Sequence, residues 1–157
     1  MVTVPLRAYE QVPVGPLAGK TVVDTNNYYP DRDGRIAALD DGSATTSGLL
    51  AAHLAGAHIV KTFNNIFFRA LAELPRPASA EDRSCLPVWG DDPAAIAEVG
   101  GFLDDIGYDS FLAGPLSESW RAENGQPAYV YPYATGHDVN HPVNGERKQP
   151  PRIAVAS

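Results

Sequence analysis

Cysteine is almost absent from this sequence, and Cys85 is its single example. A lone cysteine excludes a disulfide within the chain, and because no base lies near it in the sequence we expect a buried structural thiol. No apolar run approaches the roughly 20 residues that a membrane-spanning helix needs. The first residues also lack the basic segment and apolar stretch of a secretion signal. These absences predict a cytoplasmic protein that does not bind membranes.

Positive charge is the next scarce feature. The chain has 12 Lys and Arg residues against 19 Asp and Glu residues, which gives a formal net charge of -7. An acidic protein repels phosphate backbones and anionic lipids rather than collecting them. The composition therefore predicts small-molecule ligands and no nucleic-acid partner.

The side-chain groupings that would mark nucleophilic catalysis or a metal site are also missing. The sequence shows no convincing Ser-His-Asp or Cys-His arrangement, so we predict no catalytic side chain. His137 and His141 have a spacing that could bind a metal if the segment were helical. Gly136 and Pro142 argue against a helix there, and we predict no metal site.

The sequence does contain an alternation of strand-like and helix-like segments. Apolar and β-branched runs predict strands ending at Val4 and spanning residues 21–24, 57–63, 85–89 and 108–112. Capping residues and apolar spacing predict helices over residues 46–54, 66–74 and 93–106. This alternation predicts one α/β domain with a mostly parallel sheet and flanking helices. Pro87 lies inside the fourth run, which favours an edge position for that strand.

The pattern changes after residue 123. Residues 124–157 contain five prolines and few aliphatic side chains. We therefore divide the chain into a domain of residues 1–123 and a proline-rich tail or docking arm of residues 124–157. Tyr129, Tyr131 and Tyr133 alternate in this arm, which would let an extended stretch lie against another surface.

Polar residues follow the expected strands at the points where the strands end. Asn26 and Asn27 come directly after Asp24, and Asn64 and Asn65 follow the next strand. An open parallel sheet binds its ligand outside the carboxyl ends of its strands, so these loops are the expected site. The asparagines could equally make turns. Lys61 could pair with a phosphate or, as the more ordinary outcome, with Asp24.

Several short blocks in a common order resemble the coenzyme F420-dependent NADP oxidoreductases. They are V-x-x-F-N-N at 60–65, G-D-D at 90–92 before a helix, and A-G-P-L at 113–116. The resemblance covers about Val2 to Trp120. It implies a partial Rossmann-like fold that begins at the fourth strand of the family.

The resemblance leaves the first three strands of that fold without a counterpart. The family's G-x-G-x-x-G loop, which holds the dinucleotide phosphates, is also missing from this sequence. The chain is thus identified as N-terminally truncated by on the order of 60–80 residues. We interpret Met1 as an internal start within a longer reading frame.

The reaction that the resemblance implies is hydride transfer between the nicotinamide of NADP(H) and a deazaflavin, coenzyme F420, or a similar acceptor. Such a step needs two flat rings held together with water excluded. The residues expected to bind the cofactor are Thr3, Val4, Pro5 and Asn26. The residues expected to bind the substrate are Asn64, Asn65, Gly114 and Pro115.

Two other functions stay open at this point. The truncated chain could be a non-catalytic interaction or scaffold module derived from a Rossmann domain. It could also belong to a related NAD(P)-dependent reductase that acts on another small molecule, such as an imine or a 3-hydroxy acid. The strand ending at Val4 lacks its neighbour, and an uncovered apolar edge invites pairing. We therefore expect a homo-oligomer formed through this edge or through the tail.

Overall fold

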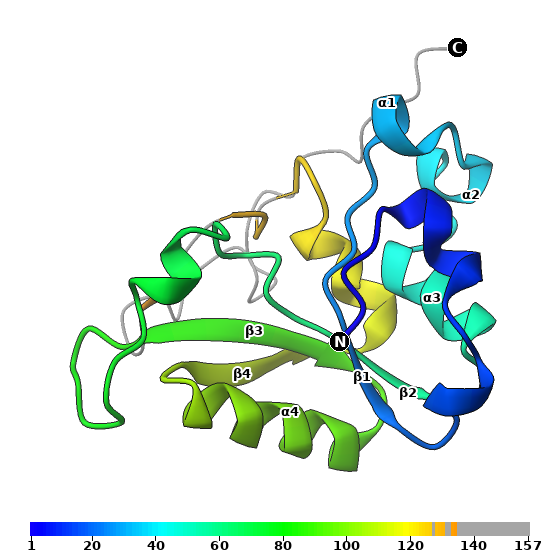
Figure 1. The fold of residues 1–157 in the computed structure, drawn as a ribbon. Coiled ribbons are helices and arrows are strands. Elements are labelled where there is room, and N and C mark those ends of the chain that lie inside the picture. The colour runs from blue at the N-terminus through cyan, green and yellow to red at the C-terminus, as the bar shows by residue number, and fades with distance from the viewer. Residues whose placement is uncertain (127, 131–132, 135–157) are drawn as a thin grey trace.

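The computed structural model describes residues 1–126, 128–130 and 133–134. Its strands are β1 (Thr21–Asp24), β2 (His58–Lys61), β3 (Ser84–Gly90), β4 (Asp109–Gly114) and β5 (Tyr133–Ala134). Its α-helices are α1 (Pro30–Asp33), α2 (Ala37–Asp40), α3 (Thr46–His53) and α4 (Pro93–Asp105). Short 3-10 helices are η1 (Leu6–Gln11), η2 (Gly15–Leu17), η3 (Ala70–Ala72) and η4 (Leu116–Ala122). Strands and helices alternate along the chain (Figure 1).

One mostly parallel sheet contains these strands in the order β1-β2-β3-β4, with β5 beside β3. β1 is parallel to β2 and β3 is parallel to β4, whereas β2 and β3 are antiparallel. Val2 adds a parallel bridge to Asp24, on the side of β1 that faces away from β2. The segments that contain Val2, Asp24 and Lys61 therefore run side by side in the same direction. This confirms the predicted α/β class and the parallel arrangement of these three segments.

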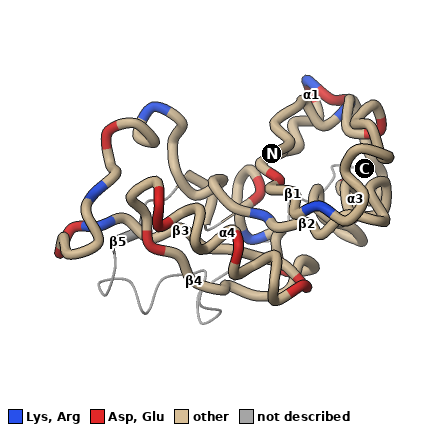
Figure 2. The backbone as a smooth tube through the Cα atoms, turned by 60° about the horizontal axis from the view of Figure 1, so that its bottom comes forward, with Lys and Arg blue, Asp and Glu red and all other residues tan. Residues whose placement is uncertain are grey.

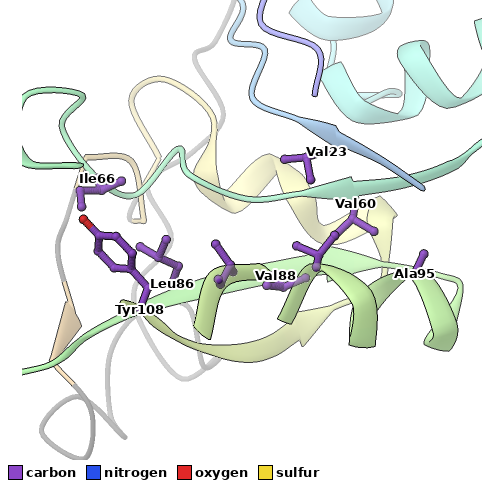
Figure 3. Packing of buried hydrophobic residues seen from close by; sticks show 9 residues of the cluster. Val23, Val60, Ile66, Leu86, Val88, Ala95 and Tyr108 are labelled. Atoms are coloured by element: carbon purple, nitrogen blue, oxygen red, sulfur yellow. The ribbon is translucent and has the colours of Figure 1, made fainter. Parts of the chain in front are cut away.

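The sheet has an apolar core on each of its two faces. Because successive residues of a strand point to opposite faces, β1 and β2 contribute to both. Val23 and Val60 belong to the cluster that packs with α4, and Val22 and Ile59 belong to the cluster that packs with α3. Figure 1 shows α4 on one side of the sheet and α3 on the other. Figure 3 shows the first cluster gathered between the strands and α4.

The two longest helices begin at the capping residues that the sequence predicts. Thr45 Oγ1 accepts a hydrogen bond from the Gly48 backbone N–H at 2.9 Å at the start of α3. Asp92 Oδ1 accepts from the Ala95 N–H at 2.9 Å at the start of α4. Within the described residues, no helix has the length and apolar character that crossing a membrane requires.

The helix predicted over 66–74 does not form, and that prediction is wrong. The segment makes isolated turns instead, with hydrogen bonds from Ile66 N to Phe63 O and from Ala70 N to Phe67 O. Its only helical part is η3. The chain beyond it is tied to the loop before β4, because Arg76 N donates to Gly107 O at 3.0 Å. Tertiary contacts thus overrule the local helix preference of a segment whose second half contains strong helix formers, Ala, Leu, Arg and Glu.

β3 is an interior strand, so the predicted edge position is also wrong. It pairs with β4 along one side and with β2 and β5 along the other. β2 pairs only at Trp89 and Gly90, and β5 only at Ser84 and Cys85. Pro87 lies between these two pairings, where β3 has a strand on one side alone among the described residues. Proline has no backbone N–H to donate. It is tolerated at this position, as at a sheet edge, because no neighbouring strand needs that donor.

The first residues after position 123 pack against the domain. Ala128 is fully buried beside Trp89 and Ala122, and Val130 N donates to Asn64 O at 2.9 Å. β5 adds residues 133–134 to the sheet. Tyr131 and residues 135–157 of the predicted arm lie outside the described part of the chain.

Cys85 lies in β3 and is partly buried against the cluster that contains Trp89. Burial, together with the nearby Asp109 carboxylate, raises the pKa of its thiol to about 11. The thiol is therefore protonated at neutral pH and is a poor nucleophile, as a structural role requires.

Removing the cap of α4 should destabilise the protein. Asp92→Ala leaves the Ala95 N–H without its acceptor and should lower the free energy of unfolding by about 1 kcal/mol. Urea denaturation followed by circular dichroism measures this change. Asp105→Ala, at the exposed last turn of the same helix, is the control and should have no such cost, because a carboxylate there is unfavourable to the helix dipole. Equal losses in both variants would contradict the cap assignment.

Candidate functional site

The carboxyl ends of β1 and β2 meet at a buried ion pair. Asp24 and Lys61 are the last residues of these strands and are register partners. Lys61 Nζ lies 3.5 Å from Asp24 Oδ2, and both residues are 0% exposed. Charges taken this far from water persist only when their remaining polar atoms are satisfied.

Hydrogen bonds satisfy this pair completely. Lys61 Nζ donates to the Asn26 backbone carbonyl and to Thr46 Oγ1 in addition to Asp24, which uses its three protons. Asp24 Oδ1 accepts from the Asn26 N–H at 2.8 Å, and Oδ2 accepts from Ser47 Oγ at 2.6 Å. The pair thus ties β1 and β2 to the loop after β1 and to the first turn of α3. The more ordinary of the two outcomes expected for Lys61 is the one observed.

Asn64 follows β2 and has its side chain held in one orientation. Its Nδ2 donates to Asn27 Oδ1 at 2.7 Å and also faces the carbonyl oxygens of Thr25 and Asn26 at 3.3 and 3.4 Å. Two of these acceptors are backbone atoms, so the atom that faces them must be the amide nitrogen. Asn64 Oδ1 is turned the other way, is buried, and has no hydrogen-bond partner in the described part of the chain. A buried acceptor without a donor costs roughly 1–3 kcal/mol, which a ligand N–H would recover.

Asn64 lines a cavity of about 700 Å³. Seven of the lining residues are aromatic: Tyr29, Phe63, Phe67, Phe68, Phe102, Tyr108 and Tyr129. Thr3, Thr25 and Asn27 add polar atoms, and none of the lining side chains is charged. A largely apolar cavity of this size with a few polar groups is typical of a small-molecule site.

Two tyrosine hydroxyls add a hydrogen-bond donor to this cavity. Tyr29 and Tyr129 both line it, and their hydroxyls are hydrogen-bonded to each other. Burial, and then the bond to Tyr29, raise the pKa of Tyr129 to about 12. Its hydroxyl therefore stays protonated at neutral pH. The pair carries two protons and uses one between its oxygens, so one O–H is available to a ligand.

The backbone is strained on two sides of the same cavity. In the described residues, Phe63 at φ 70° and Val130 at φ 52° are the non-glycine residues with positive φ. Both line the cavity. A β-branched residue such as Val130 is rarely found there, and such strain persists where the surrounding structure enforces it, commonly at ligand sites. The bond from Val130 N to Asn64 O is part of that enforcement.

The structure brings some of the predicted cofactor-binding residues together at this point. Thr3 lines the cavity. Asn26 does not line it but is buried between the lining residues Thr25 and Asn27, with its backbone carbonyl shared by Lys61 and Asn64. Val4 lines a separate cavity on the other side of the first segment, and Pro5 is exposed at the start of η1.

The predicted substrate-binding residues are divided between two places. Asn64 lines the cavity, and Asn65 next to it is buried. Gly114 and Pro115 lie at the end of β4, which β2 and β3 separate from β1, and they are not among the residues that line the cavity. The sequence predicts where the strands end. It does not reveal that the antiparallel strand β3 lies between β2 and β4.

The sequence did not single out Tyr29, Phe102 and Tyr129 as site residues. Tyr29 lies in the long polar loop after β1, and the unusual length of that loop was the one available signal. Tyr129 comes from the segment assigned to the tail, and Phe102 from the exposed side of α4. Among the described residues, no group of three His, Cys, Asp or Glu side chains is placed to hold a metal ion. His137 and His141 lie outside the described residues.

Comparison with known proteins shows a shared fold. No protein-family model matches the chain. The crystal structure of the hypothetical protein SMa0349 from Sinorhizobium meliloti matches 82% of this chain and 60% of its own, with a TM-score of 0.63 and 21% identity. That of a "putative F420 dependent NADP-reductase" from Arthrobacter sp. FB24 matches 74% of this chain and 55% of its own, with a TM-score of 0.58 and 22% identity.

One sequence relative matches a shorter stretch. "Putative protein YjhV" of Escherichia coli K12 is 34% identical over 53 residues, which are 34% of this chain and 39% of the relative. The chain spans about three fifths of the length of the solved structures and less of this relative. At these identities the solved structures establish a Rossmann-like α/β fold for the matched part.

Breaking the buried ion pair should be costly. Lys61→Met leaves the Asp24 carboxylate buried without its cation and should lower the free energy of unfolding by about 3–5 kcal/mol. The Asp24→Asn/Lys61→Met double variant should recover part of that loss, because no lone charge remains. Lys20→Met, at an exposed lysine, is the control and should change little. Urea denaturation of the wild-type chain and the three variants measures the free energy of unfolding. A loss below about 1 kcal/mol in Lys61→Met would contradict the assigned role.

Proposed function

We propose that this chain is the ring-binding part of an NAD(P)(H)-dependent oxidoreductase, in which the cavity at the ends of β1 and β2 holds the nicotinamide ring. The observation that supports this most directly is an aromatic cavity lined by Asn64, whose buried Oδ1 has no hydrogen-bond partner in the described part of the chain. Open α/β sheets bind their ligands at this end of the strands. The shared fold agrees with the proposal.

The polar groups of the cavity match a primary carboxamide. Such a group has an N–H donor and a carbonyl acceptor on the same carbon atom. Asn64 Oδ1 is an acceptor without a donor, and the Tyr29–Tyr129 pair has one proton to donate. The two sides of the carboxamide would therefore find one partner each. The aromatic lining would take the flat faces of the ring.

The cavity has room for a second flat ring beside the first. The acceptor that the sequence resemblance implies is a deazaflavin such as coenzyme F420 or a similar molecule. A bound nicotinamide supplies hydride transfer, which requires positioning rather than a nucleophile. In this chain Asn64 and the tyrosine pair orient the carboxamide. Phe63 and Phe102 exclude water from the reacting faces.

This sequence lacks the motif that binds the phosphate half of a dinucleotide. A G-x-G-x-x-G loop does not occur among the 157 residues. The ring end of the cofactor fits the residues present, and the pyrophosphate end does not. Reduced nicotinamide mononucleotide should therefore bind to this chain about as tightly as NADPH does.

Ligand titration tests the proposal. The fluorescence of reduced nicotinamide mononucleotide is compared with that of its 3-acetylpyridine analogue, which keeps the carbonyl but has no N–H to donate. The carboxamide should bind about tenfold more tightly, because only it satisfies Asn64 Oδ1. In Asn64→Ala the two ligands should bind equally.

Tyr28→Phe is the matched control for this experiment. Tyr28 bonds to Asp40 and to the Ile36 N–H, and it does not line the cavity. This variant should keep the full preference for the carboxamide, whereas the Tyr29→Phe/Tyr129→Phe double variant, which removes both hydroxyls, should weaken both ligands because both have the carbonyl. Absence of saturable binding, or a preference that survives Asn64→Ala, would refute the proposal and favour a scaffold role.

A further inference from the structure

Arg32 is held in one orientation beside the cavity that Asn64 lines. Its guanidinium lies over the ring of Tyr29, with Cζ 4.7 Å from the ring centroid. Nε and Nη2 donate to the two carboxylate oxygens of Asp33 at 2.9 and 2.8 Å, and Nη2 also donates to the Asn27 carbonyl oxygen at 2.8 Å. Figure 2 shows basic and acidic residues next to each other along α1, the helix that contains this pair. Because Tyr29 and Asn27 line the cavity, the arginine contacts the cavity wall at two points.

The Asp33 carboxylate fixes this guanidinium. The Asp33 side chain is 0% exposed, and besides Arg32 it accepts from the backbone N–H groups of Arg7 and Tyr29. Burial acts to raise the pKa of Asp33, but these hydrogen bonds hold it below its usual value, so the carboxylate stays charged at neutral pH. A guanidinium oriented in this way loses little further freedom when it binds a ligand.

Two N–H groups of the arginine remain for a ligand. A guanidinium has five N–H donors, and Asp33 and Asn27 use the one on Nε and both on Nη2. None of the described residues accepts a hydrogen bond from Nη1. The Arg32 side chain is 40% exposed, which allows a ligand to approach it. Burial raises the pKa of Tyr129, which also lines the cavity, and the Arg32 cation is near enough to oppose that rise.

Asn27 adds another donor to the same side of the cavity. Its Oδ1 accepts from Asn64 Nδ2 at 2.7 Å, and the backbone carbonyls of Thr25 and Asn26 set the orientation of Asn64. The oxygen of the Asn27 amide therefore faces Asn64, and its Nδ2 is on the other branch of the amide. This Nδ2 has no acceptor within the part of the chain that the structure describes. The loop after β1 thus combines a fixed guanidinium with a fixed amide nitrogen.

We propose that Arg32 Nη1 and Asn27 Nδ2 form a subsite for an anionic oxygen group, a phosphate or a carboxylate, on the molecule whose ring occupies the cavity. Both nitrogens only donate, and the oxygens of such an anion only accept. Hydrogen bonds between a guanidinium and an anion are about twice as strong as those between neutral groups. The chain has a net charge of -7, so an anion binds only where a cation is placed for it. This subsite rests on the proposed function, because it requires a ring in the cavity.

The anionic group can belong to the nicotinamide nucleotide or to the hydride acceptor, and two pairs of compounds distinguish these sources. Reduced nicotinamide mononucleotide is compared with reduced nicotinamide riboside, and flavin mononucleotide with riboflavin, whose flat tricyclic ring represents the acceptor. The two members of each pair differ only in the phosphate. Fluorescence titration of the 157-residue chain at constant ionic strength gives the four dissociation constants.

Three variants are titrated with the same compounds. Arg32→Met removes the cation. Asn27→Asp replaces Nδ2 by an oxygen while it keeps the oxygen that accepts from Asn64, and it leaves the Arg32 pair intact if Arg32→Met does not fold. Arg35→Met is the matched control, because Arg35 lies in the same loop, pairs with Asp40 and does not line the cavity. Thermal unfolding shows that each variant is folded.

In the wild-type chain the phosphorylated member of at least one pair should bind about tenfold more tightly, and that pair identifies the molecule that carries the anion. Arg32→Met and Asn27→Asp should lose this preference while they bind the unphosphorylated member as before, and Arg35→Met should keep it. Equal binding within both pairs, or a preference that survives in Arg32→Met and Asn27→Asp, would overturn the subsite and leave the proposed function standing. If none of the four compounds binds, both proposals are overturned.

Discussion

The buried pair of Asp24 and Lys61 is the constraint on which the rest of this structure depends. It joins the last residues of two parallel strands and is completed by the first turn of α3 and the loop after β1. Isolated charges could not stay at this depth, because the desolvation penalty is several kcal/mol for each ion. The full set of hydrogen bonds is what allows both residues to be 0% exposed. The backbone around the strand ends is fixed as a consequence.

That fixed backbone explains the orientation of the Asn64 side-chain amide. The carbonyl groups of Thr25 and Asn26 face the Asn64 amide nitrogen, and Lys61 holds the second of them from the other side. The oxygen of Asn64 is therefore turned away from them, buried and without a donor. The strained backbone of Phe63 and Val130 surrounds the same cavity. A polar cluster that stabilises the fold thus also fixes the orientation of a buried acceptor that has no partner among the described residues.

Local chemistry explains which parts of the fold could be predicted from the sequence. The caps of α3 and α4, the strand ending at Asp24 and the alternation of elements follow from residue type and spacing. The antiparallel direction of β3 and the loss of the helix at 66–74 depend on long-range contacts that spacing does not encode. At the site, Asn64 could be found because it follows a strand, whereas Tyr129 reaches the cavity from a distant segment. Gly114 looked equivalent to Asn64 only because the order of the strands was unknown.

The central claim is that the strand ends fixed by Asp24 and Lys61 present Asn64 to a nicotinamide ring. The most direct measurement is a nuclear magnetic resonance titration of the labelled chain with reduced nicotinamide mononucleotide. The account predicts that the side-chain amide of Asn64 and the backbone amides of Thr3 and Phe63 shift together, while Gly114 at the end of β4 does not. Shifts centred on Gly114, or an Asn64 side chain that does not respond while other residues do, would contradict it.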